Sequence, residues 1–417
     1  MSTASKSPAP SRRVTKLLIR DLAQAVSPAG THAPIRGREA MRSVDVVEDA
    51  FILCEDGRVS AVGRMRALDP LDGDVEELDG SGCAAIPGLV DCHTHAVFAG
   101  SRVEEFELRS GGATYEELHA AGGGILSTVR ATRAAGAEGL ADALALHRSW
   151  MLASGTTTFE AKSGYGLDRD TELAMLRVVR EAGGSPTWLG AHAVPPEFAD
   201  ADAYVDFALA EVLPEAAKIA EAADVFLERG AFDAAQARRY LEACRGAGLR
   251  LRLHADQFTE AGGVPLAIEL GAVSVDHLEA TGPDGVRALA QSDVAAVLLP
   301  VAALFLDRPM PPGRALMDEG AIVALATDFN PGSAFCESLP LVVALSCTQM
   351  HMSPAEALAA CTVNAAHVLG RADRVGRLAP GYEADIVLLD ASDWRYLAYH
   401  LGANHVAQVI RAGTPTA

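Results

Sequence analysis

The chain has 417 residues, a hydrophobic content of 49% and a formal net charge of −20. This length and composition suit one large domain with a well-buried core and a second, smaller domain. The negative charge argues against nucleic acid or an anionic membrane surface as a partner, because both would repel an acidic protein.

Two further features bear on the cellular setting. The seven cysteines are scattered, odd in number and without a Cys-x-x-Cys pair, which favours reduced thiols over a disulfide framework. The longest apolar run, residues 294–306, contains Pro300 and is shorter than the roughly 20 residues that a membrane span needs. We therefore expect a cytoplasmic protein that does not cross a membrane.

The two ends of the chain share a strand-rich pattern. Residues 1–13 are rich in Ser, Ala and Pro and predict a disordered tail. Residues 14–82 alternate short apolar runs with turn signals, among them a hairpin turn at Asp56-Gly57, and residues 375–417 contain further strand-like runs. This pattern predicts a small β-sandwich domain formed by residues 14–82 and 375–417 together.

Between these ends, residues 83–374 alternate apolar, strand-like runs with stretches of helical composition. The eight strand-like runs are Ile86–His95, Gly155–Lys162, Pro186–Ala193, Asp224–Glu228, Leu249–Ala255, Ala272–Leu278, Val294–Pro300 and Ala321–Asp328. Eight repeats of an apolar strand and a helix are typical of the α/β class, and specifically of a (β/α)8 barrel. In such a barrel the active site lies at the carboxyl ends of the strands.

Metal-ligand side chains stand at the ends of several of these runs. The first run ends in His93 and His95, which strand alternation places on one face. His254 stands near the end of the fifth run and Asp328 ends the eighth. Three imidazoles and one carboxylate suit a single Zn²⁺ or Fe²⁺ ion with room for a water molecule. Such an ion lowers the pKa of the water, which can then attack a carbonyl near pH 7.

Other residues near the strand ends allow more than one interpretation. His277, in the sixth run, is not needed as a fifth ligand and suits proton transfer or carbonyl polarisation better. Cys92 faces away from the two histidines of the first run. Lys162, His192 and Glu228 also stand near strand ends, on the side where such a barrel has its active site.

The pattern at this point resembles a known family. Pro-Gly-Leu-Val-Asp-x-His-Thr-His, the lone later His and the Thr-Asp of the last run are similar to the amidohydrolase superfamily. Its members hydrolyse ring amides or deaminate rings in a metal-dependent barrel with a side β-sandwich. More narrowly, the chain resembles the imidazolonepropionase family of histidine degradation. The matching segments are residues 93–102, 112–117, 122–130, 160–167, 190–195, 254–257 and 328–333.

The resemblance implies a reaction and a set of roles. Metal-activated water would hydrolyse 4-imidazolone-5-propanoate to N-formimidoyl-L-glutamate, with one Zn or Fe ion per subunit of a homodimer and no organic cofactor. The implied metal ligands are His93, His95, His254 and Asp328. The implied substrate contacts are Arg102, Tyr165, His192, Gln257, Asn330, Gly332 and Ser333. Arg102 suits the substrate carboxylate, because a guanidinium can hold a carboxylate through two hydrogen bonds.

Three positions need comment within the family. Gln257 stands where some members have Glu, and an amide cannot act as a base, so proton transfer would depend on His277 and Asp328 while Gln257 hydrogen-bonds the ring. Ser333 stands where Thr is frequent and keeps the hydroxyl. Lys162 occupies a strand end where some superfamily members carry a carbamylated, metal-bridging Lys, a role that belongs to binuclear sites and is not carried over.

Two alternatives remain at this point. A related cyclic deaminase could share the metal site, and it would release ammonia, which ring opening does not. Some amidohydrolase-like proteins are non-catalytic assembly proteins that have lost metal ligands, whereas this chain has all four.

Overall fold

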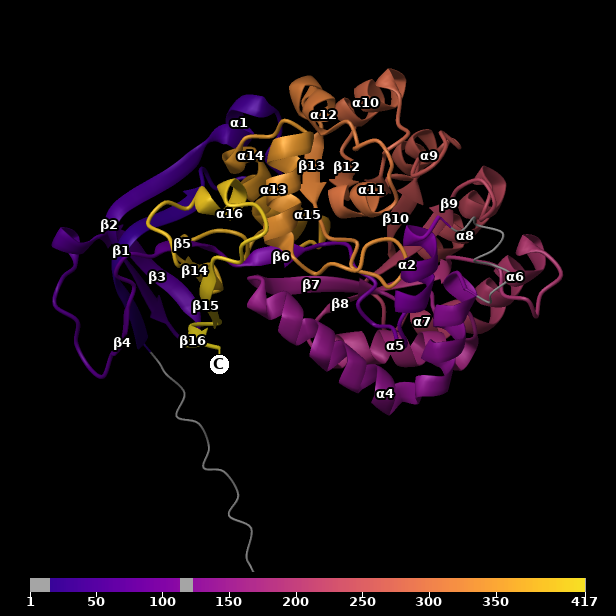
Figure 1. Ribbon diagram of the computed structural model, residues 1–417, viewed down its shortest axis with the longest axis horizontal. Coiled ribbons are helices and arrows are strands. Elements are labelled where there is room, and N and C mark those ends of the chain that lie inside the picture. Colours follow the sequence, from indigo (N-terminus) through magenta and orange to yellow (C-terminus); the bar gives the residue numbers. More distant parts are fainter. Residues whose placement is uncertain (1–15, 113–122, 417) are drawn as a thin grey trace, which may run out of the picture.

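The computed structural model describes residues 16–112 and 123–416, so the tail expected at residues 1–13 lies outside the described residues. The chain forms two eight-stranded sheets, one from its two ends and one from its middle (Figure 1). This arrangement confirms the predicted fold class, a (β/α)8 barrel with a smaller β unit built from both ends. In the described ranges, no helix is long and apolar enough to cross a membrane.

The sheet built from the two ends, which we call the terminal sheet, has the order β16-β15-β14-β5-β1-β2-β3, with β4 paired to β1. Strand β5 joins the two ends, because it pairs in parallel with β1 and antiparallel with β14. The indigo and yellow strands therefore lie side by side in Figure 1. The strands are β1 (Lys16–Pro28), β2 (Val44–Glu55), β3 (Arg58–Arg64), β4 (Glu76–Asp79), β5 (Ala84–Pro87), β14 (Ile386–Leu389), β15 (Val406–Arg411) and β16 (Thr414–Pro415).

The predicted hairpin turn at Asp56-Gly57 is confirmed. Strands β2 and β3 pair antiparallel around it, and both turn residues have positive φ, 48° for Asp56 and 79° for Gly57. Two such residues in sequence are characteristic of tight hairpin turns, in which Asp-Gly is a favoured pair.

The barrel sheet is parallel throughout and follows chain order from β6 to β13. Its ends are joined just beyond the first and last strands, where Thr94 and Phe329 form a parallel bridge. The N–H of Asp328 donates to the carbonyl of His93 at 3.0 Å, and the N–H of His95 donates to the carbonyl of Phe329 at 2.9 Å. The strands are β6 (Leu89–Asp91), β7 (Thr156–Lys162), β8 (Ser185–Ala191), β9 (Ala222–Leu227), β10 (Arg250–Ala255), β11 (Ser274–His277), β12 (Ala295–Leu298) and β13 (Ile322–Leu325).

The first predicted run, Ile86–His95, is divided between the two sheets. Ile86 belongs to β5 of the terminal sheet, and the barrel strand begins only at Leu89. Gly88 lies at the crossing, where a Cβ would lie 2.2 Å from Oγ1 of Thr157. A side chain at this position would therefore collide with β7. The expected barrel domain, which begins at residue 83, includes β5, but β5 pairs with strands of the terminal sheet.

Helices surround the barrel, and several begin at side-chain caps. Asp168 caps α5 by accepting from the N–H of Thr171, and Asp233 forms a capping box with Gln236 at the start of α8. The α-helices are α1 (Arg38–Arg42), α2 (Val103–Ser110), α4 (Ile125–Ala153), α5 (Arg169–Glu181), α6 (Ala201–Phe207), α7 (Leu213–Ala216), α8 (Ala234–Gly246), α9 (Gly263–Leu270), α10 (Pro283–Ala290), α11 (Pro300–Phe305), α12 (Gly313–Glu319), α13 (Leu339–Gln349), α14 (Pro354–Ala359), α15 (Ala365–Val368) and α16 (Tyr396–Tyr399).

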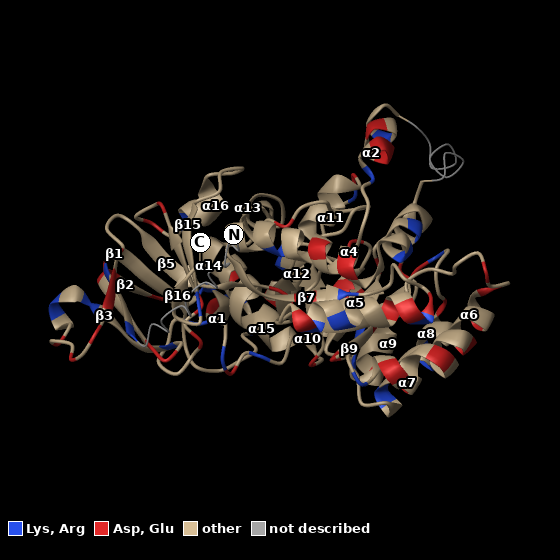
Figure 2. Ribbon diagram, turned by 90° about the horizontal axis from the view of Figure 1, so that it is seen from below, with Lys and Arg blue, Asp and Glu red and all other residues tan. Residues whose placement is uncertain are grey.

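Acidic and basic residues are interspersed over the helices outside the barrel (Figure 2). Ion pairs join neighbouring helices there, as Arg238 on α8 does with Glu269 on α9 at 2.6 Å. Such exposed pairs contribute little to stability, about 0 to 1 kcal/mol each. The fold therefore depends mainly on its apolar core.

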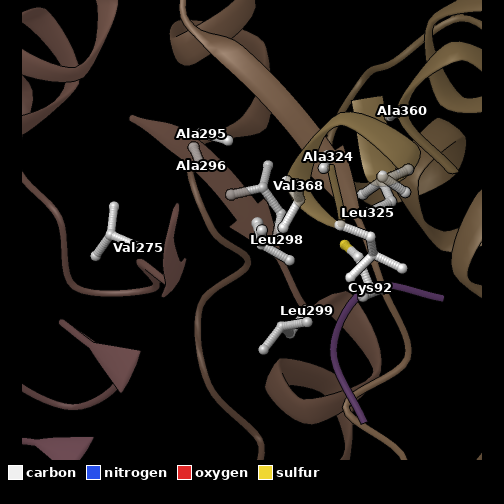
Figure 3. Close-up of a cluster of buried hydrophobic side chains, with 14 of the residues drawn as sticks. Cys92, Val275, Ala295, Ala296, Leu298, Leu299, Ala324, Leu325, Ala360 and Val368 are labelled. Carbon is white, nitrogen blue, oxygen red and sulfur yellow. The ribbon is translucent and has the colours of Figure 1, made fainter. Parts of the chain in front are cut away.

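The main apolar core lies between the barrel and the helices outside it. Figure 3 shows Cys92 among apolar side chains that include Leu298, Leu325 and Val368, and these four residues belong to one buried cluster. Cys92 thus packs outside the barrel, which confirms that it faces away from its two histidine neighbours. Truncating a buried Leu in such a cluster to Ala typically costs about 2 to 5 kcal/mol.

Candidate active site

Four side chains, one from β10 and three from the segments just after β6 and β13, converge at the carboxyl end of the barrel. The Nε2 atoms of His93 and His95 each lie 3.4 Å from Oδ1 of Asp328, and Nε2 of His254 lies 3.3 Å from Nε2 of His95. Ligand atoms bound at about 2.0 to 2.1 Å to a tetrahedral ion are about 3.3 to 3.4 Å apart. These spacings fit one metal ion.

Two of the imidazoles are oriented by buried carboxylates. Nδ1 of His93 lies 2.5 Å from Oδ2 of Asp276, and Nδ1 of His254 lies 3.0 Å from Oδ1 of Asp224. Both rings therefore direct Nε2 towards the centre of the cluster, as metal-binding histidines commonly do. Within the part of the chain that the structure describes, the buried Nε2 of His93 has no hydrogen-bond partner, which also fits a metal ligand.

Burial sets the protonation of these rings. It lowers the pKa of His95 to about 3 and that of His254 to about 4, and it holds the pKa of His93 well below its usual range. Burial raises the pKa of Asp328. The three imidazoles are therefore neutral at pH 7, which is the form that binds a metal ion.

His277 stands beside the four converging groups. A ring nitrogen of His277 and ligand atoms of His93 and His254 all lie within 4.8 Å of one another, and Nδ1 of His277 is 3.3 Å from Oε1 of Glu279. Burial lowers the pKa of His277, but the Glu279 carboxylate outweighs this effect and leaves the pKa raised. His277 is thus more readily protonated than His93, His95 and His254.

Backbone strain marks this end of the barrel. His277, Leu278 and Asp328 have positive φ values of 87°, 73° and 56°, a region that residues other than Gly rarely adopt. Such strain is commonly found at functional sites, where the surrounding structure holds it in place.

Tyr165 and His192 lie next to His95. The rings of Tyr165 and His95 are 5.8 Å apart, and that of His192 is 5.3 Å from each of them. Nδ1 of His192 lies 3.0 Å from the carbonyl oxygen of Gly164, so it donates there and Nε2 remains as an acceptor. Gln257 is buried in the loop after β10.

The side chain of Asn330 holds the loop after β13 through hydrogen bonds to its backbone. Oδ1 of Asn330 accepts from the N–H groups of Gly332 at 2.8 Å and Ser333 at 2.7 Å, while its Nδ2 donates to the carbonyl of Asp328 at 2.6 Å. Oγ of Ser333 lies 3.4 Å from Oδ2 of Asp328. Asn330 therefore stabilises this turn, and Ser333 is the residue of the turn whose side chain faces the Asp328 carboxylate.

Arg102 lies at the start of α2 and contacts Glu105 and Gly332. Its Nη2 and Nε bind Glu105 on α2, with Nε 3.0 Å from Oε2. Its Nη1 lies against Gly332, where a Cβ would be 2.2 Å away. Arg102 thus connects the loops that follow β6 and β13, at the edge of the site.

Comparison with known proteins places this geometry in a family. The amidohydrolase family model matches residues 84–416. The chain is 61% identical to the imidazolonepropionase of Rubrobacter xylanophilus, over 96% of this chain and 98% of that protein. It is 48% identical to the imidazolonepropionase of Chloroflexus aggregans, over 95% and 97% of the two chains.

The chain belongs to the amidohydrolase family. Within that family it groups with the imidazolonepropionases, as the resemblance predicted. Solved structures show the same fold in guanine deaminase of E. coli, at 14% identity, TM-score 0.73 and coverage of 97% of this chain and 99% of that one. An adenosine deaminase from Xanthomonas campestris, described with bound zinc, matches at 20% identity, TM-score 0.71 and coverage of 96% and 92%.

Several residues at this amidohydrolase site are absent from the sequence-based prediction. Glu172 on α5 accepts from the N–H groups of Gly164 at 2.9 Å, Gly166 at 2.9 Å and Leu167 at 3.0 Å. It thereby holds the loop that carries Tyr165. A Glu five residues after a Gly-rich loop carries no distinctive sequence signal, so only the fold reveals this role.

Charged residues inside the barrel strands form a second missed group. Glu160, Asp224, Arg252 and Asp276 are at most 1% exposed, and Asp224 and Asp276 orient the imidazoles described above. Charges inside apolar, parallel strands are rare unless they are paired, and this signal could have identified them. Glu228, by contrast, accepts from the N–H groups of Phe258 and Thr259 and so fixes the loop after β10.

Proposed function

We propose that this member of the amidohydrolase family is an imidazolonepropionase, which hydrolyses 4-imidazolone-5-propanoate to N-formimidoyl-L-glutamate. The observation that carries this proposal is the convergence of four ligand-type side chains, in which three pairs of ligand atoms are 3.3 to 3.4 Å apart. The pairs are His93–Asp328, His95–Asp328 and His95–His254. The relatives at 61% and 48% identity support the choice of substrate, because both align over nearly their full length.

The proposed cofactor is one Zn²⁺ or Fe²⁺ ion per subunit, held by these four residues. The donor set of three neutral imidazoles and a carboxylate suits either ion. A bound divalent ion would lower the pKa of a water molecule and polarise the substrate carbonyl.

The substrate carboxylate is proposed to bind Arg102. Nε and Nη2 of Arg102 already bind Glu105, so we assign the carboxylate to the remaining N–H groups, on the side of Gly332. The ring then lies between Arg102 and the four converging side chains. We assign ring contacts to Tyr165, His192, Gln257 and Ser333, together with the loop that Asn330 and Gly332 form.

The proposed reaction breaks one ring carbon–nitrogen bond. Water adds to the carbonyl carbon, the ring nitrogen leaves with the bonding electrons, and the nitrogen takes a proton. Oδ2 of Asp328, near Ser333, is placed to accept the proton of the attacking water. His277, held through Nδ1 by Glu279, can donate a hydrogen bond to the carbonyl oxygen as negative charge develops there.

The assembly and location are part of the same proposal. We propose a homodimer in the cytoplasm, as the resemblance implies, and all seven cysteines are free, which agrees with a reducing compartment. Light scattering of the purified protein would measure the subunit number, and a monomer at micromolar concentration would contradict the dimer.

The function is tested with the purified protein and synthetic 4-imidazolone-5-propanoate. We expect loss of the substrate absorbance, formation of N-formimidoyl-L-glutamate and no ammonia, with one Zn or Fe per chain by elemental analysis. Release of ammonia would instead indicate a cyclic deaminase. Metal-replete protein with no turnover of this substrate would overturn the proposal.

A further inference from the structure

Five charged side chains are buried inside the barrel, next to the proposed metal ligands. They are Glu160 and Lys162 on β7, Asp224 on β9, Arg252 on β10 and Asp276 on β11. Each side chain is at most 1% exposed. Buried charges are costly unless they are paired and hydrogen-bonded, so these five residues, which we call the buried charge network, require an explanation.

Each carboxylate of the network contacts a segment that carries a proposed metal ligand. Asp224 binds His254 twice, through Nδ1 at 3.0 Å and through its backbone N–H at 3.2 Å. Asp276 binds Nδ1 of His93 at 2.5 Å. Oε2 of Glu160 accepts from the N–H of Thr94 at 3.0 Å, between His93 and His95.

The two cations join these carboxylates to one another. Nζ of Lys162 lies 2.9 Å from Oε1 of Glu160, 2.9 Å from Oδ2 of Asp224 and 3.9 Å from Oδ2 of Asp276. Arg252 lies 3.3 Å from Glu160 and 2.9 Å from Asp276. Lys162 therefore pairs closely with Asp224, which binds His254, and with Glu160, which binds the backbone between His93 and His95.

We propose that Lys162 is a positioning residue for the metal site, acting through Asp224 on His254 and through Glu160 on the backbone between His93 and His95. The inference rests on the proposed metal site and adds residues that support its ligands. Lys162 has a role distinct from a metal-bridging lysine, because its ammonium is paired with two carboxylates within 2.9 Å. Loss of the ammonium would leave Asp224 as an unbalanced buried charge, free to shift away from His254.

The test measures Co²⁺ affinity of the full-length protein by competition with a chelator, beside thermal unfolding of the metal-free protein. Lys162→Met removes the ammonium and keeps most of the side-chain volume. The matched control is Arg377→Met. Arg377 is also a buried cation, 2% exposed, but it donates to the carbonyls of Ala29 and His32, at 2.9 Å each, beside the terminal sheet.

We expect Lys162→Met to weaken Co²⁺ binding by about 10- to 100-fold, as for other residues that orient metal ligands. The visible spectrum of bound Co²⁺, which reports ligand geometry, should change as well. Arg377→Met should lower the unfolding temperature and leave both the affinity and the spectrum as in the wild type. A wild-type affinity and spectrum in Lys162→Met would overturn the proposal.

A double variant tests the route through Asp224. Asn at position 224 keeps an oxygen that can accept from Nδ1 of His254. The double variant Lys162→Met/Asp224→Asn removes both charges of the ion pair, so it leaves no unbalanced charge. It can therefore be measured even where Lys162→Met alone does not fold. It should bind Co²⁺ within a few-fold of Asp224→Asn alone, because the two changes remove one interaction. Full additivity would overturn the route through Asp224. A wild type that binds no Co²⁺ would overturn the metal site itself.

Discussion

Arg102 donates from Nε to Oε2 of Glu105 at 3.0 Å, and the same oxygen accepts from the backbone N–H of Gly124 at 2.7 Å. One carboxylate thus joins the start of α2, which projects from the body of the barrel (Figure 2), to the start of α4. The side chains of Arg102 and Glu105 are 15% and 14% exposed. Their pairing is therefore partly shielded from water, and it fixes the direction in which the remaining guanidinium N–H groups point.

The first prediction is that Arg102→Met lowers kcat/KM, because it removes a charge-assisted pair with the substrate carboxylate. The loss should correspond to a rise of about 2 to 5 kcal/mol in activation free energy. Metal content should not change. Arg109→Met is the control: Arg109 lies on the same helix, 4.5 Å from the ring centre of Phe305, and its loss should leave kcat/KM near the wild-type value. A substrate analogue without the carboxylate completes a double cycle. If the two deletions simply add, Arg102 does not bind the carboxylate.

The second prediction concerns Glu105→Gln. The Gln amide has one accepting oxygen in place of two, so it cannot accept from all three donors that Glu105 now satisfies. The guanidinium should therefore lose its fixed orientation while keeping its charge. We expect KM to rise several-fold, up to about tenfold, with kcat nearly unchanged. Glu104→Gln, at the exposed neighbouring position, is the matched control. A lower KM in Glu105→Gln would show instead that Glu105 competes with the substrate for Arg102.

The barrel and its ligand set could be predicted because both depend on local patterns. Apolar runs of strand length alternate with helical segments, and a strand that ends in His93 and His95 places both rings on one face. The division of the first run at Gly88 could not be predicted, since Ile86 and Leu89 are both buried and apolar. The two strands are assigned to different sheets only by their pairing partners, which are distant in sequence: β5 pairs with β14, and β6 pairs with β7.

Prediction of the surrounding site was limited by long-range contacts. Asp276 contacts His93 across 183 positions of sequence, and Asp224 contacts His254 across 30. Asp224 and His254 lie on the neighbouring strands β9 and β10, whereas Asp276 on β11 meets a residue that follows β6, a strand that is not its neighbour. Neither pairing leaves a local spacing signal. Glu105 was missed for a different reason: a Glu in the first turn of a helix ordinarily needs no explanation beyond the helix dipole.

The third prediction separates a metal ligand from a catalytic group. Asp328→Ala should lose both metal and activity, because it removes the carboxylate that faces His93 and His95 and the acceptor for the water proton. His277→Ala should keep one metal ion per chain and lose about 10²- to 10⁴-fold in kcat. Elemental analysis and steady-state kinetics of both variants check this. Stoichiometric loss of metal from His277→Ala would identify His277 as a ligand, which its position near His93 and His254 also permits.

The last prediction concerns pH. Burial lowers the pKa of His95 to about 3 and that of His254 to about 4, and an imidazole is neutral above its pKa, which is the form that binds metal. At pH 5.5 an ordinary histidine, with a pKa near 6.5, would be about nine-tenths protonated. These two rings should instead stay neutral, so they should contribute almost no loss of metal affinity between pH 7 and pH 5.5.

Burial raises the pKa of Asp328, which favours the protonated carboxyl, a poor ligand, as the pH falls. Selective ¹⁵N labelling of histidine in the metal-free protein measures ring protonation directly. We expect the ring signals of His95 and His254, assigned by their absence in His95→Gln and His254→Gln, to remain those of neutral imidazole down to pH 5.5. Midpoints near pH 6.5 for these two rings would show that water reaches them, and that the site is less tightly closed than their burial indicates.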